Sequence, residues 1–404
     1  MSTYTDASLI YYPSGYKAGK AYSLKPTDGS GDLDFTRAST ATRVNESGLI
    51  EEVAANVPRL DNSQGGCSSL LLEPQRTNLF LNSNSTEGFN ASNATRTLNQ
   101  ITSPDGSINA SSVVCTNNFG NINRGGQAVT AGTKYVYSVF LKLKDTNWAY
   151  IRVLSTDLDY FVWIDLLNGI KGTDANSVGS IQDYGNGWFR CNIVFTNISA
   201  TTANIYTYPT SSNNTTSAIG NSFYAWGIQL EAGSYSTSLI PTTTTAVTRT
   251  QDSATKSGIS SLIGQTEGTL FFNVNYKQLS TTARFITISN ATNSNLVQFY
   301  TSANSSTLRG YIAINGTIIF DGTIKNLNIS EFFKIAIAYK SGDTKIYVDG
   351  NLLITRNIIY TTGIFNVLNF ANQFNNSPFE GQVQSLMVFP SALSDTELAT
   401  LTTI

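Results

Sequence analysis

The sequence contains no histidine at all. This absence excludes Ser-His-Asp and Cys-His catalysis as well as histidine-ligated zinc, and it removes the commonest general base at neutral pH. No G-x-S-x-G nucleophile motif, P-loop or dinucleotide-binding fingerprint occurs either. We therefore expect a protein that is not an enzyme, with no catalytic residues to name.

Charged residues are also scarce, at 13% of the chain, which is about half the usual share. The formal net charge is −2 and no basic block occurs, so nucleic acid is not an expected partner. The three cysteines, Cys67, Cys115 and Cys191, are far apart and odd in number. This spacing argues against a disulfide framework and against a CxxC metal site.

The N-terminus has no basic segment followed by an apolar one, as a secretory signal would have. No run approaches the roughly 18 apolar residues that a membrane helix needs. We expect the chain to be made and kept in a reducing cytoplasm until something releases it. Its many Asn-x-Ser/Thr sequons, for example at Asn90, Asn93 and Asn315, would then carry no glycan.

What the chain does contain favours β-structure. Of its 404 residues, 41% are hydrophobic and 11% are aromatic, so a proper core can form. Thr, Tyr, Phe, Val and Ile suit pleated, half-buried surfaces, while Asn, Gly and Ser supply turns. Length alone suggests two or three domains. The composition therefore predicts an all-β protein.

The stretch from Leu33 to Leu79 alternates short extended pieces with turn formers, and it has no apolar run long enough to build its own core. It must lie against the following domain or against a neighbouring copy of the chain. It contains the sequence segments FTRASTATRV, GLIEEVAANVPRLD and GGCSSLLLEPQRTNL. In this order they resemble the N-terminal region of a broad family of bacteriophage virion proteins, the head-spike, head-fibre or tail proteins. The resemblance implies that residues 1–79 are an extended virion-docking region. The docking or interface residues would be Arg37, Arg43, Arg59, Arg76, Glu51, Glu52 and Glu73, with each arginine pairing with carboxylates or backbone carbonyls.

Residues 80–245 read as one domain of short strands at sandwich-like spacing. In KYVYSVFLKLK, residues 134–144, Tyr135, Tyr137, Val139 and Leu141 share one parity and so one face. The domain contains the sequence segments YSVFLK, GNGWFRCNIVF and YAWGIQLEAGSYSTSLIPT. These segments resemble the carbohydrate-binding-module-like jelly roll of the same phage proteins. Trp188 and Trp226 lie within them, and we expect both tryptophans in the core.

Residues 246–258 are rich in threonine and low in hydrophobic residues, and they read as an extended linker. Residues 259–404 form a second sandwich, with a hairpin at residues 339–345 and a tight turn at residues 349–351. Ser394 and Glu397 predict a capping box on a short helix that starts at Asp395. This part contains the sequence segments FKIAIAYKSGDTKIYVDGNLL and FEGQVQSLMVFPSALSDTELATL. These segments resemble concanavalin A-like domains of the laminin G type.

Glycoside hydrolysis needs two carboxylates across one cleft. Glucanases of the concanavalin A-like fold carry a Glu-x-Asp-x-Glu pattern on one strand, and this sequence has none. The nearest candidate is Asp157-Leu-Asp159, whose spacing suits one face of a strand, but its surroundings read better as a hairpin loop. Laminin G-type domains often hold calcium through loop oxygens. Calcium is possible here but cannot be assigned to residues, and no cofactor is otherwise expected.

Sugar binding is the more plausible activity, since such modules stack aromatic faces on pyranose rings and bond sugar hydroxyls through amides and carboxylates. Clustered, polar-flanked aromatic residues are the candidates, although core or subunit packing is the alternative for each. The carbohydrate-binding candidates are Trp148, Tyr150, Tyr160, Trp163, Tyr206 and Tyr208.

The resulting expectation is two tandem β-sandwiches preceded by an extended docking arm, in a structural protein of a phage head or tail. It would decorate the virion and adhere to host or environmental glycans. Its partners would be other virion proteins and itself, as a homotrimer by analogy with phage fibres. The alternatives are a polysaccharide depolymerase and a bacterial surface adhesin. Deleting residues 1–79 should leave soluble sandwiches that no longer join particles.

Overall fold

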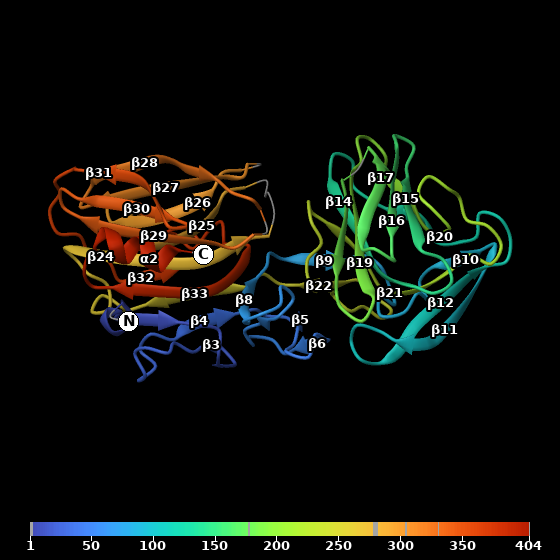
Figure 1. Ribbon diagram of the computed structural model, residues 1–404, viewed down its shortest axis with the longest axis horizontal. Coiled ribbons are helices and arrows are strands. Elements are labelled where there is room, and N and C mark those ends of the chain that lie inside the picture. Colours follow the sequence, from blue (N-terminus) through green and yellow to red (C-terminus); the bar gives the residue numbers. More distant parts are fainter. Residues whose placement is uncertain (1–2, 177, 278–281, 304, 330, 404) are drawn as a thin grey trace. The chain divides into compact units, whose positions relative to one another are not determined.

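The computed structural model describes residues 3–176, 178–277, 282–303, 305–329 and 331–403 (Figure 1). The chain is almost entirely β-structure, with sheets built from antiparallel strands, which confirms the predicted fold class. It divides into two compact units. The middle unit comprises Ala41–Glu52 and Gln75–Arg249, and the C-terminal unit comprises Met1–Thr40, Val53–Pro74 and Thr250–Ile404. Among the described residues, no helix is long and apolar enough to cross a membrane.

The middle unit is a sandwich of two six-stranded sheets, which we name the front and back sheets. The front sheet has the order β10 (Asn90–Ser92), β13 (Asn121–Ala128), β20 (Thr202–Thr210), β15 (Trp148–Leu154), β16 (Asp159–Asp165) and β17 (Ile170–Ala175). The back sheet has the order β11 (Ala94–Thr102), β12 (Ile108–Cys115), β21 (Ser222–Ala232), β14 (Lys134–Leu143), β19 (Trp188–Thr196) and β18 (Val178–Asp183).

Strand β14 shows how sequence parity builds the core of this unit. Tyr135, Tyr137, Val139 and Leu141 all lie in the cluster between the two sheets, as their shared parity predicted. Phe140, one position out of phase, points to the other side of the back sheet. There it packs with Trp188 and Trp226 beneath the hairpin of β5 (Ala41–Val44) and β6 (Ile50–Val53). Both tryptophans are therefore buried, as predicted.

The C-terminal unit is a second, larger sandwich. One sheet runs β31 (Asn351–Arg356), β30 (Thr344–Val348), β29 (Phe333–Lys340), β24 (Glu267–Tyr276), β33 (Gly381–Phe389), β8 (Ser69–Leu72) and β7 (Leu60–Asp61), and β1 (Leu9–Tyr11) also pairs with β33. The other runs β2 (Tyr16–Lys17), β3 (Lys20–Ala21), β4 (Leu33–Thr36), β23 (Ser253–Ser257), β32 (Val367–Asn369), β25 (Arg284–Ser289), β26 (Leu296–Thr301), β27 (Thr307–Ile314) and β28 (Thr317–Asn326).

The local signals near the end of the chain are confirmed. Strands β29 and β30 form the expected hairpin, and β30 turns into β31 through Asp349 and Gly350, whose φ angles of 49° and 78° suit a tight hairpin turn. Helix α2 (Asp395–Thr402) begins with a capping box between Ser394 and Glu397. Its Leu398 is buried against the strands of the first sheet.

Residues 1–79 do not form a separate arm, which corrects the prediction. Strands β1 and β8 both pair with β33, and β4 pairs with β23, so these strands complete both sheets of the C-terminal unit (Figure 1), while residues 41–52 and 75–79 belong to the middle unit. Leu9, Leu33 and Leu70 are buried in that unit's core. The sequence argument was right that the stretch needs a surface to lie on, and that surface is supplied by its own chain.

The predicted linker at residues 246–258 is also corrected. Strand β22 (Val247–Arg249) pairs with β9 (Arg76–Asn78), and β23 is a central strand of the C-terminal unit. The segment is poor in aliphatic residues, which hid the strands. However, threonine is β-branched and suits a pleated sheet.

The structure reverses the expectation for the truncated protein. Deleting residues 1–79 exposes the edge of β33 and uncovers the core beneath β1 and β8, so we expect aggregation or loss of cooperative unfolding rather than soluble sandwiches. Size-exclusion chromatography and urea unfolding measure this. Deleting only residues 1–6, of which the described residues 3–6 carry no strand, is the control and should leave a cooperative, monodisperse protein. A folded, monodisperse product of the longer deletion would contradict the assignment.

Candidate functional site

Five of the six predicted sugar-binding residues share the outer face of the front sheet. Tyr150 on β15 lies directly opposite Trp163 on β16 and Tyr208 on β20. Residues opposite one another in an antiparallel pair point to the same side. Trp148 and Tyr206 have the same parity as their strand neighbours, and Phe161, which sequence reasoning missed, joins them. We call this set the aromatic face: Trp148, Tyr150, Phe161, Trp163, Tyr206 and Tyr208.

Tyr160 does not belong to this face, which corrects the prediction. It is one position out of phase with Phe161 and Trp163, so it points into the core and is only 2% exposed. Its ring contacts Phe195, and its hydroxyl donates a hydrogen bond to the Thr196 carbonyl. Clustering along the sequence suggested a single group of aromatic residues, but alternation in a strand separates neighbours onto opposite sides.

The rings of the aromatic face stack mainly on one another. Tyr150 lies between Trp163, at a centroid distance of 4.2 Å and 19° between planes, and Tyr208, at 5.2 Å and 29°. Tyr208 in turn stacks with Tyr206 at 5.9 Å. Both faces of the Tyr150 ring are therefore occupied. A sugar ring cannot stack on it, and what Tyr150 offers to a ligand is its ring edge and its hydroxyl.

Trp148 is placed differently. A Cβ at Gly172 would lie only 2.6 Å from Cζ3 of Trp148 and 2.7 Å from Oδ1 of Asn213, so the indole occupies the space that a side chain on β17 would fill. Trp148 is partly exposed. Asn213 also bonds Thr173, accepting from its backbone N–H at 3.1 Å and donating to its hydroxyl at 3.0 Å. The indole thus lies over the sheet beside amide and hydroxyl groups, as a sugar-stacking residue would.

Amide side chains extend the face beyond the aromatic rings. Asn123 on β13 lies opposite Tyr206, and Asn121 shares its parity. Nδ2 of Asn123 donates to Oδ1 of Asn121 and to Oγ of Ser92, both at 2.9 Å. Sequence reasoning missed these residues, although the alternation Asn121-Ile122-Asn123 with a buried isoleucine was a readable signal.

One ion pair lies on the face and was also missed. Arg152 donates two hydrogen bonds to the carboxylate of Asp159, at 2.8 and 2.7 Å. The Asp159 hydrogen bonds hold the pKa of the guanidinium above its ordinary value, although partial burial opposes the shift. The other carboxylate on this side, Asp165, is buried and accepts hydrogen bonds from the N–H groups of Leu167 and Asn168 at 2.9 and 3.1 Å.

Asp157 and Asp159 do not form the paired carboxylates considered as a catalytic site. Asp157 lies in the loop joining β15 to β16, and its carboxylate accepts hydrogen bonds from the backbone N–H groups of residues 198–200 at 2.7 to 3.0 Å. Together with a bond from the Ser199 hydroxyl, these hold the pKa of Asp157 at about 2. A carboxyl with so low a pKa is a poor proton donor at neutral pH.

The low pKa of Asp157 predicts how stability depends on pH. Its folded-state pKa lies below the unfolded value of about 3.9, so its contribution is complete above pH 4 and is lost as the pH falls through about 2. The Asp157→Asn protein should be less stable than the natural one at pH 7, with the difference shrinking towards pH 2, as measured by urea unfolding. Asp183→Asn, at the end of β18 with one hydrogen bond from the N–H of Gly185, is the control. A carboxyl resonance of Asp157 that titrates near pH 4 would contradict the assignment.

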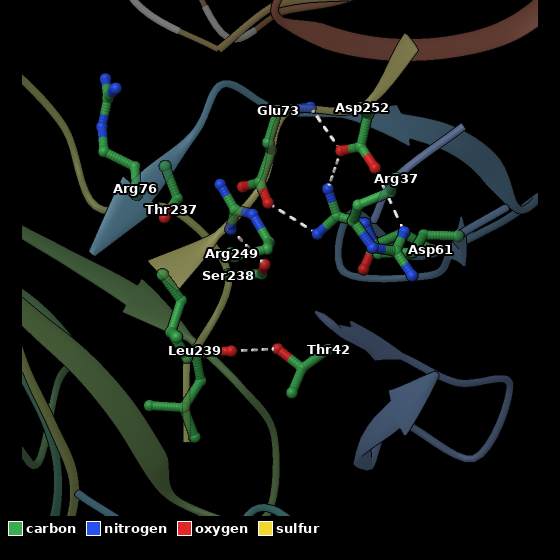
Figure 2. A network of polar contacts seen from close by, with 12 residues as sticks. Arg37, Thr42, Asp61, Glu73, Arg76, Thr237, Ser238, Leu239, Arg249 and Asp252 are labelled. Carbon is green, nitrogen blue, oxygen red and sulfur yellow. Dashed lines mark hydrogen bonds and ion pairs between the residues drawn. The ribbon is translucent and has the colours of Figure 1, made fainter. Parts of the chain in front are cut away.

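Three of the predicted docking residues are buried inside the C-terminal unit. Arg37, Arg59 and Glu73 surround Asp252, and all four side chains are at most 3% exposed (Figure 2). Arg37 donates to Oδ1 of Asp252 at 3.1 Å, and Arg59 bonds both Asp252 and, at 2.6 Å, Glu73. Burial would lower the pKa of Arg59, but the two carboxylates raise it. These residues therefore form ion pairs inside the unit and are not the docking contacts that were predicted.

The other docking candidates lie in the middle unit. Arg43 pairs with Glu51 across the β5–β6 hairpin at 2.7 Å. Arg76 lies 3.9 Å from the buried Glu231 and over the ring of Tyr235. Glu52 is exposed. Two polar side chains near the end of β21 bind the segment that follows this strand. Glu231 accepts a hydrogen bond from the N–H of Thr237 at 2.8 Å, and Gln229 accepts one from the N–H of Ile240 at 2.7 Å.

The buried cluster predicts a large effect on stability. Arg59→Leu leaves Asp252 and Glu73 buried without this cation, so the free energy of unfolding should fall by about 3–5 kcal/mol. Urea unfolding of the full chain measures it. Arg309→Leu removes a pair with Asp321 that is largely exposed, and the change there should stay below about 1 kcal/mol. Equal losses of stability for the two substitutions would show that the buried cluster stabilises the fold no more than an exposed ion pair does.

Within the described ranges, no group of three or more Asp, Glu or Cys side chains is placed to hold a metal ion. The calcium considered from the sequence therefore has no carboxylate cluster to which it could be assigned. Cys67 is exposed, Cys115 and Cys191 are buried, and all three are free thiols.

In the comparison with known proteins, a family model matches only the C-terminal part of the chain. The family model of the concanavalin A-like lectin/glucanases superfamily, of the laminin G type, matches residues 249–399. The C-terminal unit thus has the concanavalin A-like fold that was predicted. No curated protein matches the chain.

Similar solved structures include a CBM40 module of the Ruminococcus gnavus IT-sialidase bound to α2,3-sialyllactose, with 17% identity, a TM-score of 0.30, and coverage of 34% of this chain and 84% of that one. Domain 4 of AbnA, an extracellular arabinanase from Geobacillus stearothermophilus in complex with arabinotriose, has 16% identity, a TM-score of 0.31, and coverage of 38% and 73%. A heptameric SAP-like pentraxin from Limulus polyphemus has 12% identity, a TM-score of 0.27, and coverage of 33% and 68%. Likenesses this remote carry no argument about a ligand.

Proposed function

We propose that this protein binds carbohydrate through the aromatic face of its middle unit, without catalysis. The observation that carries the proposal is the indole of Trp148, which lies over Gly172 and beside Asn213 instead of inside the core. A partly exposed apolar ring beside amide and hydroxyl groups is the combination that a sugar needs, because a pyranose has both an apolar face and a rim of hydroxyls.

The neighbouring residues supply the polar contacts. Tyr150 is partly exposed, and burial raises the pKa of its hydroxyl to about 12, so this hydroxyl remains a neutral donor and acceptor at physiological pH. On β13 Asn123 adds a partly exposed amide, which is held in place by its hydrogen bond to Asn121. Because the stacked rings of the aromatic face brace one another, they are held in place before a ligand arrives, which lowers the entropy lost on binding.

Binding rather than turnover is supported by how the carboxylates of this region are used. Asp159 is paired with Arg152, Asp165 holds a turn, and Asp157 holds the adjacent loop. A depolymerase would need two carboxylates facing one another across a groove. A reducing-end assay with the polysaccharide that binds best separates the two functions.

We also propose that the protein is a structural component of a phage particle, a spike or fibre of the head or tail that is assembled in the host cytoplasm. The proposal is supported by the sequence segments between Leu33 and Leu79, which resemble those of phage virion proteins in the same order, and by the small share of charged residues in the chain. A homotrimer is the assembly expected by analogy with phage fibres. Arg43, Arg76, Glu51 and Glu52 remain the candidates for contacts with other virion proteins. Mass spectrometry of purified particles tests the placement.

The sugar-binding proposal predicts the effect of removing one indole. Trp148→Ala should weaken binding to the best ligand of a polysaccharide panel by about tenfold or more, as expected when a well-packed aromatic hot spot is truncated. Affinity electrophoresis measures it on the full chain, with thermal unfolding as a check on folding. Gly172→Ala should also weaken binding, since its Cβ displaces the indole without removing it.

Phe374→Ala is the matched control, since it removes an exposed aromatic ring from the other unit. Its affinity should equal that of the natural protein. If Trp148→Ala bound as well as the control, or if no polysaccharide bound the natural protein, the proposal would be wrong.

A further inference from the structure

The charged side chains on the outer side of the front sheet all have hydrogen-bond partners inside the protein. Arg152 and Asp159 form a two-bond pair, so neither presents an uncompensated charge to a ligand. Asp165 is 4% exposed and turned towards the backbone N–H groups of the loop that follows β16. At the edge strand β17, Lys171 pairs with Asp174 at 3.0 Å, but these residues lie opposite Ile164 and Val162, which point into the core, so this pair is not on the outer side. The remaining groups of the aromatic face are rings, hydroxyls and amides.

This arrangement differs from what an acidic ligand requires. Carboxylates and sulfates are usually recognised by an arginine whose fork is open to receive two hydrogen bonds. Here the two donors of Arg152 that face Asp159 are already used inside the protein, and Asp159 would repel a second anion at the same place. The face therefore favours hydroxyl-rich ligands without charge.

The face is also elongated. Trp148 and Arg152 are four residues apart on β15, which is about 13 Å along a strand. Polar groups close both ends: Asn213 lies beside Trp148, and Asn204 lies opposite Leu154, with its side chain accepting the Gly126 N–H at 2.8 Å. A surface of this length suits several consecutive sugars of a chain better than a single terminal sugar.

We propose, on the basis of the proposed function, that the ligand is a neutral polysaccharide lying along β15, and that Asp159 determines this specificity by neutralising Arg152. Asp159 acts on the ligand through the arginine. It is 38% exposed in its side chain and Arg152 is 30% exposed, so the pair contributes little to folding and can be altered without unfolding the unit.

The experiment compares neutral and acidic polysaccharides on the full chain by affinity electrophoresis. The neutral probes are dextran, mannan, galactan and arabinan, and the acidic probes are alginate, polygalacturonate and hyaluronate. The natural protein should bind at least one neutral probe with an affinity that changes less than about twofold between 50 and 500 mM NaCl, because no charge is involved. It should bind the acidic probes at least about tenfold more weakly.

The Asp159→Asn variant keeps the size of the side chain and leaves the cation of Arg152 uncompensated. It should retain neutral binding within about twofold and gain acidic binding by about fivefold or more at 50 mM NaCl, a gain that 500 mM NaCl abolishes. Asp174→Asn, which opens the pair at the edge strand, is the matched control and should leave both unchanged.

The outcomes separate the two proposals. If the natural protein prefers an acidic probe and salt weakens that binding, this inference is overturned while carbohydrate binding stands. The same holds if Asp159→Asn gains nothing for acidic probes. If the natural protein binds none of the seven probes, and host capsular polysaccharide does not bind either, the proposed function fails and this inference fails with it.

Discussion

Asp252 is the group on which the C-terminal unit depends most. Its carboxylate is buried and receives bonds from Arg37, Arg59 and the backbone N–H of Glu73, so four separate stretches of sequence meet at one charge. A buried carboxylate left alone would be very unfavourable. The chain can bury it only when β4 and β8 are in place beside β23 and β33. The burial of Asp252 with its arginine partners and the completion of the two sheets therefore occur together.

The aromatic face of the middle unit follows from a different constraint, the alternation of side chains along a strand. The same strands that send Ile151, Val153 and Val162 into the core send Tyr150, Arg152 and Trp163 outwards. Because the outward rings are large and neighbouring strands are close, they stack and fix one another. At Gly172 of β17 the indole of Trp148 occupies the space that a side chain would fill. A single missing side chain at Gly172 therefore decides which ring is offered to a ligand.

Much of the fold was predictable because its signals are local. The capping box at Ser394, the turn at Asp349 and the parity of β14 each depend on a few neighbouring residues. The site was predictable in part: aromatic clustering found the right strands but placed Tyr160 on the wrong side. Arg152 was missed because its role arises from a partner on another strand, Asp159. The role of residues 1–79 was misjudged for the same reason, since nothing near Leu9 or Leu70 names β33 as the partner.

The pairing of early and late strands has a consequence for synthesis. Asp61 accepts a hydrogen bond from Gln382 at 2.9 Å, and the two residues are 321 positions apart in the chain. A ribosome that makes proteins from the N-terminus releases β1, β4 and β8 long before it has made β33. These strands must stay soluble with open edges while the whole middle unit emerges and folds. This stretch has few long apolar runs and several interspersed arginines, the same features that made it look like an extended arm. These features help the unpaired strands to stay soluble until β33 has been made.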